Sequence, residues 1–143
     1  GLSTEDEVMK TVEYIRTINP EYNKPEKLAI LQCTSMYPIA DGDAHLNVMN
    51  RLRELTGATV GYSDHTEGID ALTYATAMGA EVLEFHFTDN RSDKIFRDHK
   101  ISLMPHEVQE LIENIKRIKK FQGDCSSDCH RCIELFVESA GTK

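Results

Sequence analysis

Short apolar runs alternate with helical patterns along most of this chain, and this alternation constrains the fold more than any other feature. The apolar runs cover residues 28–34, 58–62 and 81–87, and a helical pattern follows each of them. Strands that alternate with helices pair in parallel, through right-handed crossovers. The sequence therefore predicts an α/β fold with a parallel sheet, and the shortness of the strands favours a (β/α) barrel of TIM type.

A helix is expected before the first strand, because Thr4 and Glu7 have the spacing of a capping box. Asp41 or Asp43 is predicted to cap the second helix, and Pro105 lies where the first turn of the last helix is expected. The pattern is thus one helix followed by three strand-helix units. A complete barrel needs about 250 residues, so this pattern corresponds to about half of a barrel.

The composition excludes some classes of partner. The chain has 143 residues, of which 40% are hydrophobic and 28% are charged, and its net charge is −8. Nucleic acid is not expected as a partner, because phosphate binding needs a basic face. No stretch has the apolar length of a membrane span or of a signal peptide, so we expect no membrane partner and a cytoplasmic protein.

Two motifs end on histidine where a predicted strand runs into a loop, Ser63-Asp64-His65 and Glu84-Phe85-His86. The histidines are 21 residues apart, about one helix plus one strand, so their strands are expected to be neighbours. Two imidazoles with open positions suit Mn²⁺, Fe²⁺ or Zn²⁺. Asp64 and Glu84 are candidates to orient these ligands. The alternative is that each histidine is a lone polar residue satisfied by backbone groups.

Other polar residues follow the same strands. Glu84, on the inward face of its strand, is a candidate base or a ligand of a sugar hydroxyl, and the alternative is a buried ion pair. Asp98 lies on a loop over the same end of the sheet, or is a surface residue beside Arg97. Three hydroxyl groups near strand ends are candidate donors to a phosphate or carboxylate, although their sequence is also ordinary turn chemistry: Ser35, Tyr37 and Ser63.

The last cysteines crowd the end of the chain, at Cys125, Cys129 and Cys132. With His130 they invite a zinc site, but Cys129 and His130 are adjacent and would close a tetrahedral site badly. Free thiols are the favoured interpretation, in agreement with a reducing compartment.

Several linked motifs resemble the sialic acid synthase family. They are LQCTSMYP, VGYSDHT, a helix ending in MGA, VLEFHFT, RDHKISL and PHE. The resemblance covers roughly residues 1–121 and implies the C-terminal half of a catalytic barrel over residues 1–122, with residues 123–143 as a tail. Two departures are notable. Many members have Asn where this chain has Ser35, and the usual Gly-Pro before the Asp-His pair is replaced by Ile95-Phe96-Arg97.

The resemblance implies a chemistry for these residues. Family members condense phosphoenolpyruvate with an N-acyl hexosamine such as N-acetylmannosamine, with C–O cleavage and release of phosphate. His65 and His86 would bind a divalent cation, usually Mn²⁺, that polarises the aldehyde of the amino sugar. Ser35 and Ser63 would help to hold phosphoenolpyruvate. Tyr37, Glu84 and Asp98 would lie on the amino-sugar side, with Glu84 a candidate proton-transfer group.

The family also implies a homodimer, and contacts to phosphoenolpyruvate from strands that these residues do not include. We therefore expect a partial barrel that is inactive alone or pairs with another half. Three alternatives remain open. They are a related synthase acting on phosphoenolpyruvate and another aldose, a non-catalytic remnant that binds metal or a partner chain, and a two-histidine metallohydrolase.

Overall fold

The computed structural model describes residues 1–123. Its helices and strands follow one another as α1 (Glu5–Ile18), η1 (Pro20–Asn23), η2 (Pro25–Lys27), β1 (Ala29–Cys33), η3 (Asp41–Asp43), α2 (Val48–Thr56), β2 (Thr59–Ser63), α3 (Asp70–Ala77), β3 (Val82–Glu84), α4 (Asp98–Ile101) and α5 (Pro105–Gln122). The predicted cysteine tail lies outside the described residues.

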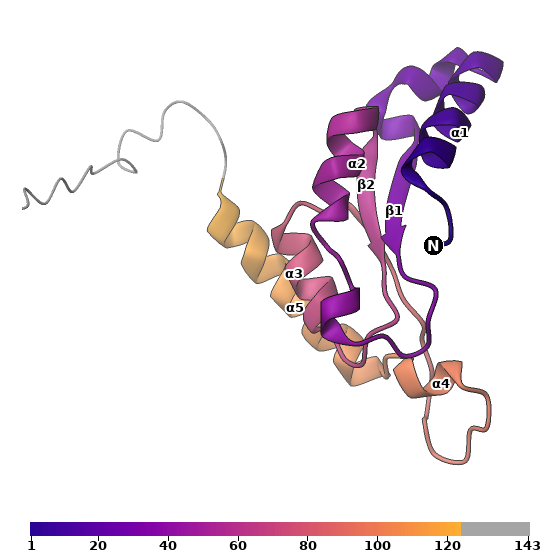
Figure 1. Cartoon of the computed structure of the whole chain (residues 1–143). Coiled ribbons are helices and arrows are strands. Elements are labelled where there is room, and N and C mark those ends of the chain that lie inside the picture. The colour runs from indigo at the N-terminus through magenta and orange to yellow at the C-terminus, as the bar shows by residue number, and fades with distance from the viewer. Residues whose placement is uncertain (124–143) are drawn as a thin grey trace, which may run out of the picture.

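The three strands form one parallel sheet in the order β1-β2-β3. Figure 1 shows α2, α3 and α5 on the same side of this sheet, while α4 lies beyond the end to which the strands point. The predicted α/β class, the parallel pairing and the neighbouring strands of the two histidine motifs are confirmed. The carboxyl ends of the strands are therefore the end at which a ligand site is expected.

The core lies between the sheet and the helices. Tyr62 and Val60 of β2 are fully buried against it. The helices contribute apolar side chains from several turns: Met49, Leu52, Leu72, Ala75 and Leu111. Side chains alternate across a strand, so the residues of β2 that alternate with Val60 and Tyr62 face the other side of the sheet. That opposite face carries Ala29, Val82 and Glu84, all of which are exposed.

Gly61 lies on this opposite face, where β2 and β3 approach closely. A Cβ atom placed on it would lie 2.3 Å from the carbonyl oxygen of Val82. The strand pair therefore requires glycine at this position.

The ends of several helices agree with the sequence. Thr4 and Glu7 form the predicted capping box at the start of α1. Gly57, with a φ of 59°, ends α2 in the left-handed conformation. α1 is tied to α2 because Arg51 donates two hydrogen bonds to Glu5, each 3.0 Å long.

Two predictions of local structure were wrong. Asp41–Asp43 forms a short 3-10 helix, and α2 begins only at Val48, without a side-chain cap. The third strand is restricted to Val82–Glu84, instead of extending over residues 81–87. Beyond it, Phe87 pairs in parallel with Leu103, a pairing that the sequence did not predict. Residues 102–104 thus continue the sheet by one further parallel pairing.

Within residues 1–123, the structure contains no helix long and apolar enough to cross a membrane.

Candidate functional site

His65 lies directly after β2 and is buried, with 4% of its surface exposed. Its Nδ1 atom lies 2.7 Å from the carbonyl oxygen of Thr34, which follows β1. A carbonyl oxygen only accepts hydrogen bonds, so Nδ1 must carry the proton and donate it. The lone pair of Nε2 is therefore free for another ligand, which is the arrangement found in metal-binding histidines.

His86 lies after β3 and faces His65, with their ring centroids 5.3 Å apart. Tyr37 contacts both rings, at 4.0 Å from the centroid of His65 and 5.6 Å from that of His86. The loop that carries Tyr37 is held against the same strand end, because the Ile39 N–H donates to the His65 carbonyl oxygen. The structure thus brings together three of the predicted site residues, from the ends of three parallel strands.

Asp98 joins this group from the first turn of α4. Its Oδ2 atom lies 3.8 Å from Nδ1 of His86. Its Oδ1 atom is buried and accepts no hydrogen bond from the described residues, although Arg97 Nε lies 3.5 Å away. A buried carboxylate oxygen without a hydrogen bond is costly unless a further group binds it. Asp98 is therefore not simply a surface residue beside Arg97, which was the alternative prediction.

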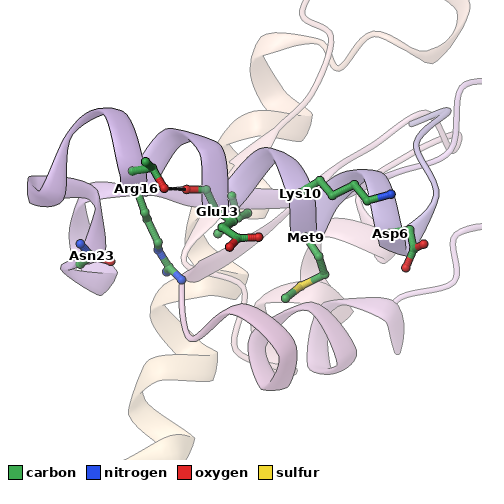
Figure 2. A pocket seen from close by; sticks show the side chains of 8 residues that line it. Asp6, Met9, Lys10, Glu13, Arg16 and Asn23 are labelled. Carbon is green, nitrogen blue, oxygen red and sulfur yellow. Dashed lines mark hydrogen bonds between the residues drawn. The ribbon is translucent and has the colours of Figure 1, made fainter.

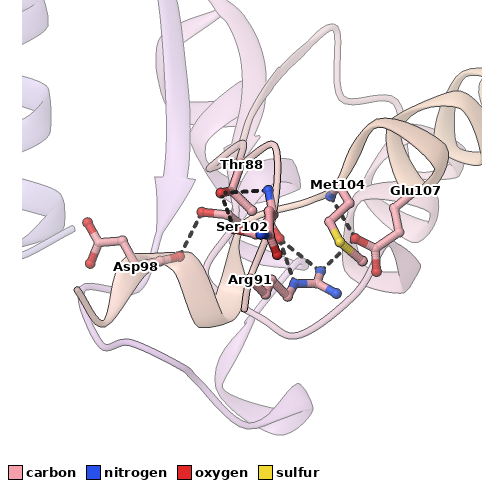
Figure 3. A network of polar contacts seen from close by, with 7 residues as sticks. Thr88, Arg91, Asp98, Ser102, Met104 and Glu107 are labelled. Atoms are coloured by element: carbon pink, nitrogen blue, oxygen red, sulfur yellow. Dashed lines mark hydrogen bonds and ion pairs between the residues drawn. The ribbon is translucent and has the colours of Figure 1, made fainter. Parts of the chain in front are cut away.

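A polar network holds the loop that carries Asp98 (Figure 3). Arg91 donates to the Ser102 carbonyl oxygen through Nε at 3.1 Å and Nη2 at 2.8 Å, and Nη2 lies 2.6 Å from Oε2 of Glu107. The same oxygen of Glu107 accepts a hydrogen bond from the Met104 N–H at 2.7 Å. The loop is thereby fastened to the start of α5. No local pattern in the sequence marks Arg91. Its partners are the Ser102 carbonyl oxygen and the Glu107 carboxylate, which lie further along the chain.

Of the three remaining site residues, Ser63 and Glu84 lie on the face of the sheet away from the core, and Ser35 lies at its edge. Ser63 and Glu84 are paired in register on β2 and β3, so their side chains share that face. Ser63 is 5% exposed, whereas Glu84 is exposed, and neither side chain makes a hydrogen bond within the described residues. Ser35 is exposed and lies beside Gly1. No contact in the described residues joins Ser35 to the histidines.

Asp64 does not orient either histidine, contrary to expectation. It is buried, and its carboxylate accepts hydrogen bonds from the Thr66 N–H at 2.9 Å, the Thr66 hydroxyl at 3.0 Å and the Tyr62 hydroxyl at 3.1 Å. Burial and the neighbouring Asp64 charge raise the pKa of Tyr62. Asp64 thus shapes the turn between β2 and α3, while backbone of the neighbouring strand orients His65.

Nitrogen and oxygen donors of the kinds that divalent cations bind lie close together here. No group of three or more His, Cys, Asp or Glu residues in the described part of the chain is arranged to hold a metal ion by itself. Two converging imidazoles and the free oxygen of Asp98 nevertheless offer nitrogen and oxygen donors at one place. Catalytic metal sites keep positions open for water or substrate. His65 and His86 would be the direct ligands in such a site.

A hollow of about 680 Å³ lies along α1, away from the histidines (Figure 2). Its lining includes Asp6, Lys10, Glu13 and Arg16, so charges of both signs alternate along the helix. It contains no histidine and no cluster of converging donors. Its volume exceeds that of the pocket lined by Tyr37 and Arg97. Its lining is nevertheless that of a solvated helix surface.

Comparisons with known proteins identify the family of this chain. The model of the family described as NeuB matches residues 1–127. The N-acetylneuraminate-9-phosphate synthase of Mus musculus is 32% identical over 99% of this chain and 38% of the mouse protein. The N,N'-diacetyllegionaminic acid synthase of Campylobacter jejuni is 40% identical over 71% of this chain and 30% of that protein. The matches therefore span only 38% and 30% of the lengths of these two relatives.

A solved structure, the N-acetylneuraminic acid synthetase of Leptospira borgpetersenii, is 32% identical, and the match covers 90% of this chain and 42% of that protein. Its TM-score of 0.74 agrees with the parallel strand order described above. The fold is the predicted α/β type, with the parallel strand-helix units of a TIM barrel present in part. The chain belongs to the NeuB family.

Proposed function

We propose that this chain supplies the metal-binding and amino-sugar side of a nonulosonic acid synthase, which condenses phosphoenolpyruvate with an N-acyl hexosamine and releases phosphate. The observation that carries the proposal is the convergence of His65 and His86 at 5.3 Å between ring centroids, at the carboxyl ends of neighbouring parallel strands. Membership of a family whose relatives are named as synthases of sialic and legionaminic acids supports the same reaction class.

Each residue has a task in this proposal. The Thr34 carbonyl fixes His65 so that Nε2 faces the site, and Tyr37 covers one side of both imidazoles. Asp98 has a free oxygen for a sugar hydroxyl or a bound water. A bound divalent cation, Mn²⁺ by preference, would supply Lewis acidity toward the sugar aldehyde.

Ser35 and Ser63 hold phosphoenolpyruvate in this proposal, and Glu84 lies on the amino-sugar side. Ser63 donates from β2, Ser35 donates from the end of β1, and the Glu84 carboxylate is the proton-transfer group between the two substrates. Glu84 lacks any cationic partner in the described residues, so its alternative as one half of an ion pair has no support there. We propose that turnover needs the further strands of a complete barrel, because phosphoenolpyruvate carries more negative charge than two serines can balance.

The first test is binding of Mn²⁺ by calorimetry to this chain and to the His65→Ala, His86→Ala double variant. We expect binding that the double variant abolishes. A His99→Ala variant is the matched control, because His99 contacts Thr88 on the neighbouring loop and neither of the two histidines. Equal binding by all three proteins, or no binding by a folded wild-type chain, would overturn the proposal.

The second test follows release of phosphate from phosphoenolpyruvate in the presence of N-acetylmannosamine. The proposal predicts no turnover by this chain as a purified monomer. Turnover by the monomer would contradict the inactivity claim and leave the reaction class in place.

A further inference from the structure

Two buried neighbours, Ser102 and Leu103, are hydrogen-bonded to the backbone of both Asp98 and His86. The Leu103 N–H donates to the His86 carbonyl oxygen at 2.7 Å, and the Ser102 N–H donates to the Asp98 carbonyl oxygen at 3.0 Å. Ser102 is 3% exposed and Leu103 is 1% exposed, so water competes little for these bonds. The two residues therefore link the strand end that carries His86 to the helix that carries Asp98.

The Leu103 side of this link is held by the sheet and the core. The Leu103 carbonyl oxygen accepts the Thr88 N–H at 3.0 Å, and Leu103 is the parallel partner of Phe87. The Leu103 side chain belongs to the hydrophobic core. A shift of His86 relative to Leu103 would therefore break backbone hydrogen bonds on both sides of Phe87.

The Ser102 side has fewer supports, and the Ser102 hydroxyl is one of them. α4 has four residues and no side-chain cap at its start, so it is too short to be stable by itself. The hydroxyl Oγ lies 2.7 Å from the Asp98 carbonyl oxygen (Figure 3). Because a carbonyl oxygen only accepts hydrogen bonds, the hydroxyl must donate here. Ser102 thus binds the Asp98 backbone twice.

Asp98 needs this support because its carboxylate lies in an unfavourable place. Its Oδ1 atom is buried and accepts no hydrogen bond within residues 1–123. Its Oδ2 atom lies 3.8 Å from Nδ1 of His86, which is too long for a hydrogen bond. A rotation of α4 toward water would hydrate both oxygens. The two bonds from Ser102 oppose that rotation.

We propose that Ser102 is a positioning residue of the two-histidine site, whose hydroxyl holds α4 so that the Asp98 carboxylate faces His86. The inference rests on the proposed function, in which His86 binds the cation. It adds a residue that touches neither the metal nor a substrate. The Asp98 carboxylate brings negative charge next to the imidazoles, so a cation binds less tightly when α4 turns away. Ser102 acts on the cation only through Asp98.

The alternative is a hydroxyl that only stabilises the end of a helix. Serine and threonine in helices often donate to the carbonyl oxygen four residues earlier. Thr76 on α3 does so, since its hydroxyl donates to the Leu72 carbonyl oxygen at 2.8 Å. Thr76 is 7% exposed and hydrogen-bonds to none of the candidate site residues within residues 1–123. Thr76→Val therefore removes a buried hydroxyl of the same kind away from the site, and is the matched control.

The test combines hydrogen exchange without metal and calorimetry with Mn²⁺. The proteins are the wild-type chain, Ser102→Ala, Thr76→Val, Asp98→Asn and the Ser102→Ala, Asp98→Asn double variant. In metal-free Ser102→Ala, the protection factor of the amide at position 102 should fall about fivefold, while that of Leu103 stays unchanged. Thr76→Val should leave both protection factors as they are. Urea unfolding shows whether the two hydroxyl variants lose similar stability.

The Mn²⁺ dissociation constant should rise about tenfold in Ser102→Ala, as is typical when a group that supports a metal ligand is lost. Thr76→Val should bind Mn²⁺ like the wild-type chain. In the Asp98→Asn background, Ser102→Ala should have no further effect, because Ser102 acts through the Asp98 carboxylate. A purely structural role for Ser102 would not produce this dependence on Asp98.

Other outcomes overturn the inference in distinguishable ways. If wild type and Ser102→Ala bind Mn²⁺ equally, the proposed function stands and the positioning role is lost. The same conclusion follows if Thr76→Val weakens binding as much, if the effects of Ser102→Ala and Asp98→Asn are additive, or if exchange at position 102 is unchanged. If the folded wild-type chain binds no Mn²⁺, the proposed function falls, and the positioning role of Ser102 falls with it.

Discussion

Glu107 fastens two segments at once, and its replacement is expected to loosen the loop that carries Asp98. One oxygen, Oε2, accepts the Met104 N–H and also pairs with Arg91. The Glu107 side chain is 20% exposed and that of Arg91 is 32% exposed, so water screens the pair only in part. Both partners would be left with unmet hydrogen bonds in a Glu107→Ala variant.

The expected cost follows from these two bonds. Hydrogen bonds to charged groups contribute about 1.5–3 kcal/mol each when one partner is removed. Because both bonds share one oxygen at a partly exposed site, we expect Glu107→Ala to lower the free energy of unfolding by about 3 kcal/mol in total. Glu107→Gln keeps an oxygen for the Met104 N–H and loses only the charge, so its cost should be about 1 kcal/mol.

The same carboxylate makes stability depend on pH. Burial opposes ionisation of Glu107, but the Met104 N–H and the Arg91 guanidinium outweigh it and hold the pKa below the ordinary value of 4.5. A carboxyl group with a lowered pKa in the folded state stabilises the protein above its unfolded pKa. That contribution is lost as pH falls below 4.5 through the folded pKa. The Glu107→Gln variant should therefore lose less stability than the wild-type chain over this acidic range.

Urea unfolding followed by circular dichroism measures both effects, at neutral pH and through the acidic range. A double-mutant cycle with Arg91→Met should give a coupling free energy of about 1 kcal/mol between the two side chains. Gln109→Ala is the matched control, since Gln109 is exposed on the same helix and bonds only to Glu113. A coupling near zero, or identical acid dependence of wild type and Glu107→Gln, would refute the reasoning.

Four further outcomes are expected. Replacing Gly61 with Ala should cost about 1–3 kcal/mol in urea unfolding, because the new Cβ would lie 2.3 Å from the Val82 carbonyl oxygen; an unchanged midpoint would show that the strands can separate freely. Tyr62→Phe should cost about 1 kcal/mol by removing the hydrogen bond to Asp64. The raised pKa keeps the Tyr62 phenol neutral in the folded state. Spectrophotometric titration of the wild-type chain should therefore show ionisation of Tyr62 only as the chain loses stability above pH 10. Ionisation of Tyr62 near pH 10 in a folded chain would contradict this. Nitrogen NMR of His65 should report a protonated Nδ1 and a bare Nε2, and the opposite tautomer would contradict the orientation described here.

Local signals predicted the parts of the fold that depend on neighbouring residues. The capping box at Thr4 and the left-handed glycine at Gly57 are decided within one helical turn, and both agree with the structure. Asp41 misled the prediction because it lies in a short 3-10 helix that has no side-chain cap, five residues or more before α2 begins. The pairing of Phe87 with Leu103 escaped it because a single parallel bridge has no periodicity.

The candidate site also combines features that the sequence predicted with features that it did not. The convergence of His65 and His86 followed from strand order, since parallel neighbours end at the same edge of a sheet. Asp98 was a candidate because its loop lies over the same end of the sheet, and its position against His86 depends on a loop whose local sequence departs from the family. The Thr34 carbonyl and the Arg91 guanidinium were missed. Backbone acceptors are present at every residue, so nothing in a sequence marks the one that fixes a histidine.

The two histidines differ in how firmly their surroundings hold them in position. His65 is buried and fixed by backbone of the neighbouring strand, so its position changes only if the sheet changes. The His86 side chain is 29% exposed and meets Asp98 from a loop that depends on the Arg91 network. A ligand that binds this loop would therefore act on His86 and leave His65 in place.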